Sequence, residues 1–194
     1  MKNDKKLKGK DLINIGIYAA IYCVIMTMIA MLGYIPIMMP LLCVFVPLIC
    51  GIPIMLFMTK VKKFGMITIL SIICGLFLWI TGMGYWPTIL SIIFGLIADL
   101  IAKSGDYKSS KKSILSYATF SIMIFGNYIP IYLNADAYFS TRQSFGDTYI
   151  NSLTNIMQLW TAPILILACF ICGIIGGLIG RSLLKKHFIK AGIA

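Results

Sequence analysis

Six long apolar runs dominate this sequence, and short polar segments separate them. The runs cover residues 12–32, 37–58, 64–81, 85–102, 113–133 and 153–180. An α-helix rises about 1.5 Å per residue, so about 20 apolar residues cross the hydrocarbon core of a bilayer. A helix also satisfies its own backbone polar groups, which lipid cannot do. The runs therefore predict an all-α integral membrane protein, a single domain (1–194) with six transmembrane helices.

The composition and the placement of charge support this prediction. Hydrophobic residues make up 60% of the chain and charged residues only 12%, about half the usual share in soluble proteins. The net charge is +11, and 16 of the 17 Lys and Arg residues precede the first run or follow the second, fourth or sixth. The positive-inside rule then predicts a multi-pass protein of the cell membrane with both termini cytoplasmic. Because these charges are spread over four segments facing anionic headgroups, we expect no nucleic-acid partner.

The sequence lacks the residues that catalysis in a membrane usually needs. It has no Glu, a single His (His187), and no glycine-rich phosphate loop with its Lys. Cys169 and Cys172 form a CxxC without further ligands, so we interpret the cysteines as small packing residues. Asp99 is the one acid inside a run, and Lys103 four residues later predicts an ion pair. We expect no enzyme activity, no catalytic residues, no cofactor and no metal site.

The first run is longer than the apolar core of a signal peptide, and no cleavage site follows it, so we expect it to be retained. Its small residues form a stripe at helical spacing, which predicts either internal packing or a docking surface for another helix. That stripe is Gly16, Ala20, Cys23, Thr27 and Ala30. The glycines of the sixth run (Gly173, Gly176, Gly177 and Gly180) favour packing within the bundle.

Polar and aromatic residues gather at the predicted outer ends of the helices. Amides such as Asn127, Asn155 and Gln158 at that depth should face protein or a water-filled cavity. The aromatic residues there suit either a pocket or the interfacial belt. The outer segment 134–152 is predicted to be a solvated extracellular loop or a lid over a pocket. Three prolines of the second run (Pro40, Pro47 and Pro53) predict a bent helix, which fits a cavity opening outward.

Four strings, in order along the chain, carry a resemblance to a known family. They are "GKDLINIGIYAAIY", "KVKKFG", "NADAYF" and "GGLIGRSLLKKHFIKAGI". With them the sequence resembles, over essentially its whole length, an S component of an energy-coupling factor (ECF) transporter, of the Trep_Strep family. The resemblance implies a subunit that captures a small, vitamin-like nutrient outside the cell. It also implies three partners, a transmembrane coupling subunit and two cytoplasmic ATPases.

The resemblance also suggests where the sites lie. S components carry small residues at AxxxA spacing in the first helix for docking onto the coupling subunit, and here Gly16, Ala19 and Ala20 take those places. Their ligand sites are built from the first outer loop and the outer ends of helices four to six. By position, the candidate substrate-binding residues are Tyr34, Trp86, Asn127, Asn155, Gln158 and Trp160. Two alternatives remain at this point, a non-transport membrane scaffold or accessory subunit and a stand-alone secondary carrier, and the missing midplane carboxylate disfavours the second.

Overall fold

The computed structural model describes residues 6–188, except for the side chains of Gln143, His187 and Phe188. Every element in this range is helical. The elements are α1 (Gly9–Ala30), η1 (Met31–Tyr34), α2 (Met38–Lys60), α3 (Met66–Leu78), η2 (Trp79–Met83), α4 (Trp86–Lys103), α5 (Ser110–Ser121), η3 (Ile122–Asn127), α6 (Ile129–Ser140), η4 (Gln143–Phe145), α7 (Asp147–Ile156), α8 (Thr161–Leu183) and η5 (Leu184–Phe188). The predictions that concern Lys2, Lys5, Lys190 and the side chain of His187 fall outside the described residues.

Six helical segments are long and apolar enough to cross a membrane, which confirms the predicted number of spans. They are Gly9–Tyr34, Met38–Lys60, Met66–Met83, Trp86–Lys103, Ser110–Ser140 and Thr161–Lys186. The first four agree with the predicted runs to within a few residues. The fold is therefore an all-α bundle of six candidate spans.

The fifth and sixth spans differ from the prediction at the segment expected to be a loop. Helix α6 continues through residues 134–140, and a further helix, α7, occupies 147–156. Asn134 leaves helical geometry (φ −161°, ψ 90°), and its Oδ1 accepts a hydrogen bond of 2.9 Å from the amide of Ala137. An asparagine in this role caps a new helical turn. The last span begins at Thr161, with Pro163 in its first turn, where a proline is tolerated.

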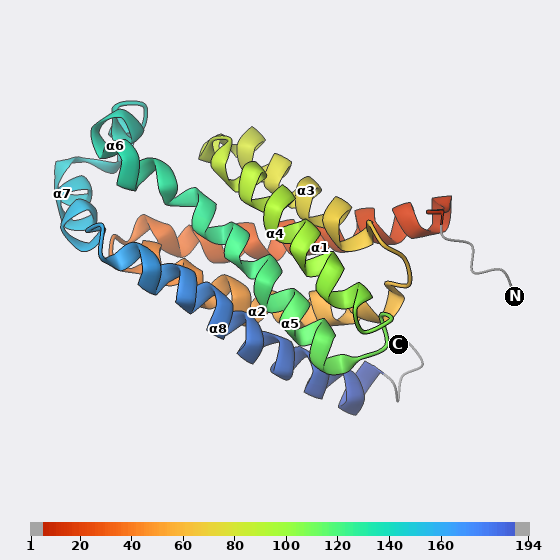
Figure 1. Cartoon of the computed structure of the whole chain (residues 1–194). Coiled ribbons are helices and arrows are strands. Elements are labelled where there is room, and N and C mark those ends of the chain that lie inside the picture. The colour runs from red at the N-terminus through yellow and green to blue at the C-terminus, as the bar shows by residue number, and fades with distance from the viewer. Residues whose placement is uncertain (1–5, 189–194) are drawn as a thin grey trace, which may run out of the picture.

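The helices run back and forth between two ends of the bundle (Figure 1). The start of α1, the α2–α3 and α4–α5 connections and the end of α8 lie at one end, and α6 and α7 lie at the other. The described Lys and Arg residues all belong to the first end except Arg142, which follows α6. We call these the basic end and the α6–α7 end.

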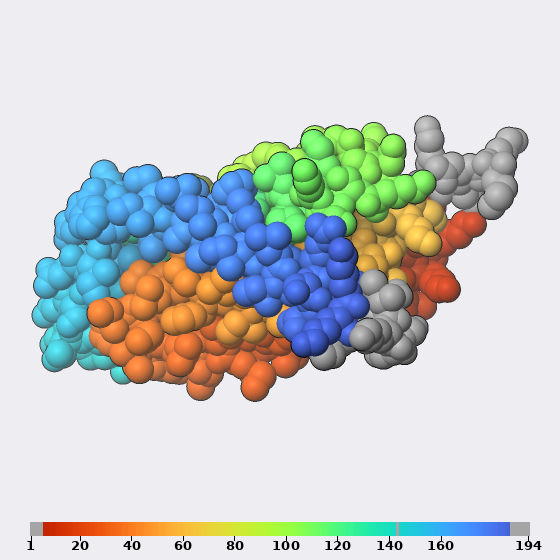
Figure 2. Space-filling view, turned by 90° about the horizontal axis from the view of Figure 1, so that it is seen from below, coloured from red at the N-terminus to blue at the C-terminus, as the bar shows by residue number. Residues whose placement is uncertain are grey.

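Among the described helices, α2 and α8 share the most extensive contact, and they lie against each other along one face in Figure 2. Glycines make this approach possible. A Cβ on Gly51 would lie 2.8 Å from Cα of Gly176, and one on Gly180 would lie 2.9 Å from the carbonyl carbon of Gly51. A side chain at either position would meet backbone, so the small residues bring the two helices together. Internal packing, as predicted for the glycines of the last span, is confirmed.

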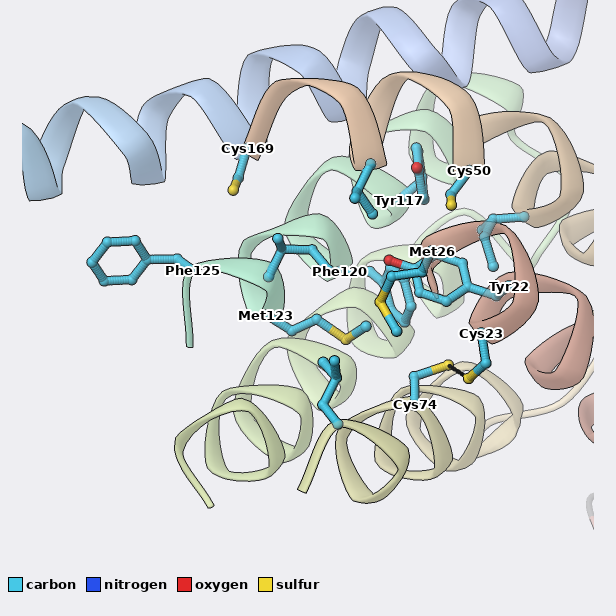
Figure 3. Packing of buried hydrophobic residues seen from close by; sticks show 14 of the residues in the cluster. Tyr22, Cys23, Met26, Cys50, Cys74, Tyr117, Phe120, Met123, Phe125 and Cys169 are labelled. Atoms are coloured by element: carbon cyan, nitrogen blue, oxygen red, sulfur yellow. Dashed lines mark hydrogen bonds between the residues drawn. The ribbon is translucent and has the colours of Figure 1, made fainter. Parts of the chain in front are cut away.

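Aromatic and sulfur-containing side chains fill the centre of the bundle (Figure 3). The ring of Tyr22 packs edge-on against Phe120 at 5.4 Å between centroids, and the hydroxyl of Tyr117 donates to the carbonyl of Pro47 at 2.6 Å. All six cysteines are free, and five are buried; the sulfurs of Cys23 and Cys74 are 3.9 Å apart. The cysteines therefore pack as small side chains, as predicted.

Candidate functional site

A cavity of about 370 Å³ lies at the α6–α7 end of the bundle. It is enclosed by the outer parts of α1, α2 and α3, by η3, and by the segment from α6 to α7. Its lining residues are Met26, Thr27, Ala30, Met31, Gly33, Tyr34, Met39, Leu42, Val46, Phe77, Leu78, Thr81, Met83, Ile124, Asn127, Tyr128, Tyr138, Arg142, Ser144, Phe145 and Tyr149. The wall is mostly apolar and aromatic with a few polar groups, as in small-molecule sites generally. We call it the outer cavity.

The tip of the α3–α4 hairpin borders this cavity. Helix α3 ends in a single π-helical turn, and the chain then reverses through Gly82 and Gly84, whose φ angles are +91° and +83°. Glycine adopts such angles without strain. In Figure 1 α6 and α7 extend past the tip of this hairpin. Leu78, Thr81 and Met83 of this hairpin line one part of the cavity, and the segment from α6 to α7 lines another.

Aromatic contacts hold α7 over the first outer turn. Tyr149 stacks on Phe145 with 4.5 Å between ring centroids, and Phe145 in turn contacts the ring of Tyr34 at 6.0 Å. The Tyr149 hydroxyl donates to the carbonyl of Gly33, and burial raises the pKa of this phenol to about 12. The phenol therefore keeps its proton at neutral pH and remains a donor. The segment predicted to be a loop or a lid is thus a helical cover that contacts the cavity.

Asn127 lines the cavity, and its amide oxygen is a buried acceptor without a partner among the described residues. Its amide nitrogen donates to the carbonyl of Ile124 at 2.9 Å, which defines the orientation of the side chain. Its Oδ1 is buried and has no hydrogen-bond partner among the described residues. A buried acceptor left unpaired costs about 1–3 kcal/mol. A buried polar group usually has a partner, so a water molecule or a ligand is expected to complete the hydrogen bonding of this oxygen.

Arg142 is the only Lys or Arg among the described residues that line the cavity. Its Nη1 donates to the carbonyl of Tyr138 at 2.8 Å and to the hydroxyl of Thr141 at 3.1 Å, and its Nη2 donates to the carbonyl of Gly82. The guanidinium carbon lies 3.9 Å from the centre of the Tyr138 ring. These contacts fix the guanidinium group between α6 and the tip of the α3–α4 hairpin.

The structure brings two of the six predicted substrate-binding residues to this cavity, Tyr34 and Asn127. The other four are not part of its lining. Trp86 stacks on Tyr85 at 5.3 Å at the start of α4, and Trp160, 67% exposed, precedes α8. Asn155 and Gln158 are exposed, and the Gln158 amide nitrogen donates to the carbonyl of Thr154. Helix α7 turns one side toward the core with Tyr149 and Leu153. Asn155 is an exposed residue of this helix, and Gln158 follows its end.

The lining residues that were not among the predicted site residues include Tyr138, Arg142, Ser144, Phe145 and Tyr149. These residues belong to the segment that was predicted to be a loop or a lid. One signal was available, because Arg142 is the only basic residue outside the four predicted cytoplasmic segments. The tyrosines gave no comparable signal, since interfacial aromatic residues are common in membrane proteins.

A second surface feature is an apolar groove of about 610 Å³ along α1 and α3. Gly16, Ala19 and Ala20 line it together with Cys23, Val24, Thr27, Met28, Met31, Ile73 and Phe77. A Cβ added to Gly16 would meet no atom within 4 Å. Ala20 is exposed as well, whereas Ala19 is only 2% exposed. Packing within the chain therefore explains the small side chain at position 19 but not the small residues at 16 and 20.

Asp99 does not form the predicted ion pair with Lys103. Its Oδ2 accepts hydrogen bonds from the amides of Gly65 and Thr68, at 2.8 and 3.1 Å, and its Oδ1 accepts from the hydroxyl of Tyr107 at 3.3 Å. The ammonium group of Lys103 lies 5.1 Å from the centre of the Phe64 ring instead. The prediction was wrong because the first turn of α3 offers amide donors to the buried carboxyl group, and helix N-termini favour such acceptors.

The part of the chain that the structure describes contains no group of three or more His, Cys, Asp or Glu side chains that could hold a metal ion.

A family model described as "hypothetical bacterial integral membrane protein (Trep_Strep)" matches residues 9–190. No curated protein and no solved structure matches this sequence.

Proposed function

Because the chain belongs to the Trep_Strep family of hypothetical bacterial integral membrane proteins, we propose that it is the substrate-binding subunit (S component) of an ECF importer. It captures a small nutrient or vitamin-like molecule outside the cell and delivers it through a transmembrane coupling subunit and two cytoplasmic ATPases. The chain itself contributes no catalytic step. The observation that carries the proposal is the outer cavity, with its aromatic wall and the unpaired Oδ1 of Asn127.

The charge distribution supports the orientation that this function needs. The basic end faces the cytoplasm by the positive-inside rule, and the outer cavity, at the opposite end of the bundle, then faces outward. The groove on α1 supports the proposed partners. Exposed small residues at positions 16 and 20 permit the close approach of another helix, and this approach is the usual role of such spacing in membranes.

Two other functions stay in competition with this one. A scaffold or accessory subunit would have no ligand, so no small molecule would raise its melting temperature. A stand-alone secondary carrier would take up substrate in vesicles without the ATPases and would depend on an ion gradient. No described acid lies near the middle of a span, which disfavours ion-coupled transport. Asp11 and Asp136 lie close to the ends of Gly9–Tyr34 and Ser110–Ser140, and Asp99 lies near the basic end, where it accepts hydrogen bonds from the first turn of α3.

Enlarging the exposed small residues of α1 should prevent assembly with the coupling module. We expect the double variant Gly16→Leu, Ala20→Leu to fold normally but to lose co-purification with the coupling subunit and its ATPases, at least about tenfold if two close contacts are lost. Co-expression followed by affinity purification of the tagged chain measures this. The matched control is Ile17→Phe with Ile21→Phe, which enlarges two exposed side chains of the same helix outside the groove. If the double leucine variant still assembles with the coupling subunit and its ATPases, Gly16 and Ala20 do not form the docking surface.

Replacing Asn127 by leucine should reduce ligand binding and leave folding intact. The substitution removes one hydrogen bond to Ile124 but also the unpaired acceptor, so stability should change by less than about 1 kcal/mol. Mass spectrometry of small molecules extracted from the purified protein should show about a tenfold lower occupancy. Gln158→Leu, an exposed amide outside the cavity, is the control. If Gln158→Leu or Trp160→Ala lowers occupancy and Asn127→Leu does not, the ligand binds elsewhere.

A further inference from the structure

The polar groups of the outer cavity indicate a class of ligand. We propose that the cavity binds a small, flat molecule that carries one carboxylate, which Arg142 binds, and one N–H or O–H group, which donates to Oδ1 of Asn127. This inference rests on the proposed function, because it takes the cavity to be the substrate site. The ligand class itself is inferred from the side chains that line the cavity.

Arg142 has donors left over for an anion. A guanidinium group carries five N–H donors, and the structure uses three of them, two on Nη1 and one on Nη2. The Nε–H and the second Nη2–H have no acceptor among the described residues. Two donors are what a carboxylate takes in a bidentate pair. The three existing contacts hold the group in place, so a ligand does not have to immobilise a free side chain.

No protein carboxylate in the described part of the chain competes for this charge. Asp136 and Asp147, the two acids nearest in the sequence, are exposed, and Arg142 forms no ion pair with any described acid. An unneutralised cation at an apolar, aromatic wall attracts an anion more strongly than it would in water. A single cation balances one carboxylate, whereas a phosphate carries about −1.5 to −2 at neutral pH.

The remaining wall limits the size and shape of the ligand. The volume of about 370 Å³ lies near the lower end of the range for small-molecule sites, about 300–1,000 Å³. Tyr138, Phe145 and Tyr149 present rings, and Met39 presents a sulfur that adapts to neighbouring shapes. Oδ1 of Asn127 has no partner among the described residues, so the proposed ligand pairs it with a donor of its own. A one- or two-ring acid with a polar hydrogen meets all of these conditions.

The test compares acids with their uncharged amides on the purified full-length protein. The probes are 4-hydroxybenzoate, indole-3-acetate and indole-3-propanoate, which differ in the separation between carboxylate and donor, each with its primary amide. In wild-type protein at about 1 mM probe, we expect at least one acid to raise Tm by about 2 °C or more. Its amide, which has the same shape without the charge, should leave Tm unchanged.

Variants at position 142 then link this preference to the guanidinium group. Arg142→Gln should abolish the shift given by the acid, and Arg142→Lys should retain a smaller one. Asp136→Asn, which removes an exposed charge from the preceding helix α6, should behave as wild type. If Arg142→Gln does not fold, the comparison of acid with amide on wild type and Arg142→Lys decides. The proposal is overturned if no acid shifts Tm, if amides act as strongly as acids, or if the shift survives Arg142→Gln.

The result is separable from the test of the proposed function. Assembly with the coupling subunit and ATPases without any effect of the acids would overturn the ligand class and leave the S-component role standing. An acid effect that depends on Arg142, without any such assembly, would support the ligand class and count against the ECF role.

Discussion

Gly176→Leu is expected to prevent α2 and α8 from packing and to destabilise the protein by about 3 kcal/mol or more. A Cβ at this position would lie 2.8 Å from the carbonyl oxygen and 3.0 Å from Cα of Leu48, and closer still to the carbonyl of Pro47. These are backbone atoms, so no rotamer change relieves the overlap, and the two helices must separate. Size-exclusion chromatography and thermal unfolding in detergent should show an aggregated or strongly destabilised protein. Gly176→Ala should give an intermediate loss.

The same substitution in α1 provides a matched control. Gly16 is also a glycine in the middle of a helix, but a Cβ there meets no atom within 4 Å. Gly16→Leu should therefore leave the stability of the isolated chain unchanged or slightly increased, because glycine is a poor helix former. Equal destabilisation by the two variants would contradict the view that the α8 glycines serve internal packing and Gly16 does not.

The periodicity and charge of the sequence were sufficient to predict the six spans. Long apolar runs leave a chain in lipid little choice but helix, and the basic segments show which connections share one end. The glycines of α8 were also interpreted correctly, because four glycines within two turns of one apolar helix are typical of close helix packing in membranes. The small residues of α1 and those of α8 look alike in the sequence. Only the packing of the folded chain shows that the α8 glycines contact other helices and that Gly16 does not.

The site was less predictable than the fold, for a physical reason. Asn127 and Tyr34 could be predicted as site residues because they lie near helix ends, and the hydropathy pattern indicates where those ends are. Tyr138, Arg142 and Tyr149 reach the cavity because Asn134 starts a new turn and α7 packs across the first outer turn. Those contacts join residues far apart in the chain, such as Tyr149 and Gly33, and no local pattern encodes them. Conversely, Asn155 and Gln158 have amide side chains suited to ligand binding, but they are exposed and do not line the cavity. The sequence did not indicate where the helix near them begins and ends.

Asp99 is the residue whose removal should show most clearly how the α3–α4 hairpin is held at the basic end. Asp99→Leu leaves the amides of Gly65 and Thr68 and the hydroxyl of Tyr107 without the acceptor they share. Each buried donor left unpaired costs about 1–3 kcal/mol, so the expected loss is about 3–5 kcal/mol. Asp99→Asn keeps one carbonyl oxygen for the amide donors and should cost about 1–2 kcal/mol. Thermal unfolding in detergent measures both.

Lys103→Met distinguishes this arrangement from the ion pair that the sequence suggested. If Asp99 depended on Lys103, removing the lysine would leave a buried charge unpaired and cost about 3–5 kcal/mol. In the observed arrangement Lys103 contributes only its contact with the Phe64 ring, which is worth about 0.5–1 kcal/mol at an exposed site. A large loss for Asp99→Leu together with a small one for Lys103→Met is the expected pair of results. Similar losses for the two variants would instead assign the stability of this end to the ion pair, and the capping of α3 by Asp99 would be secondary.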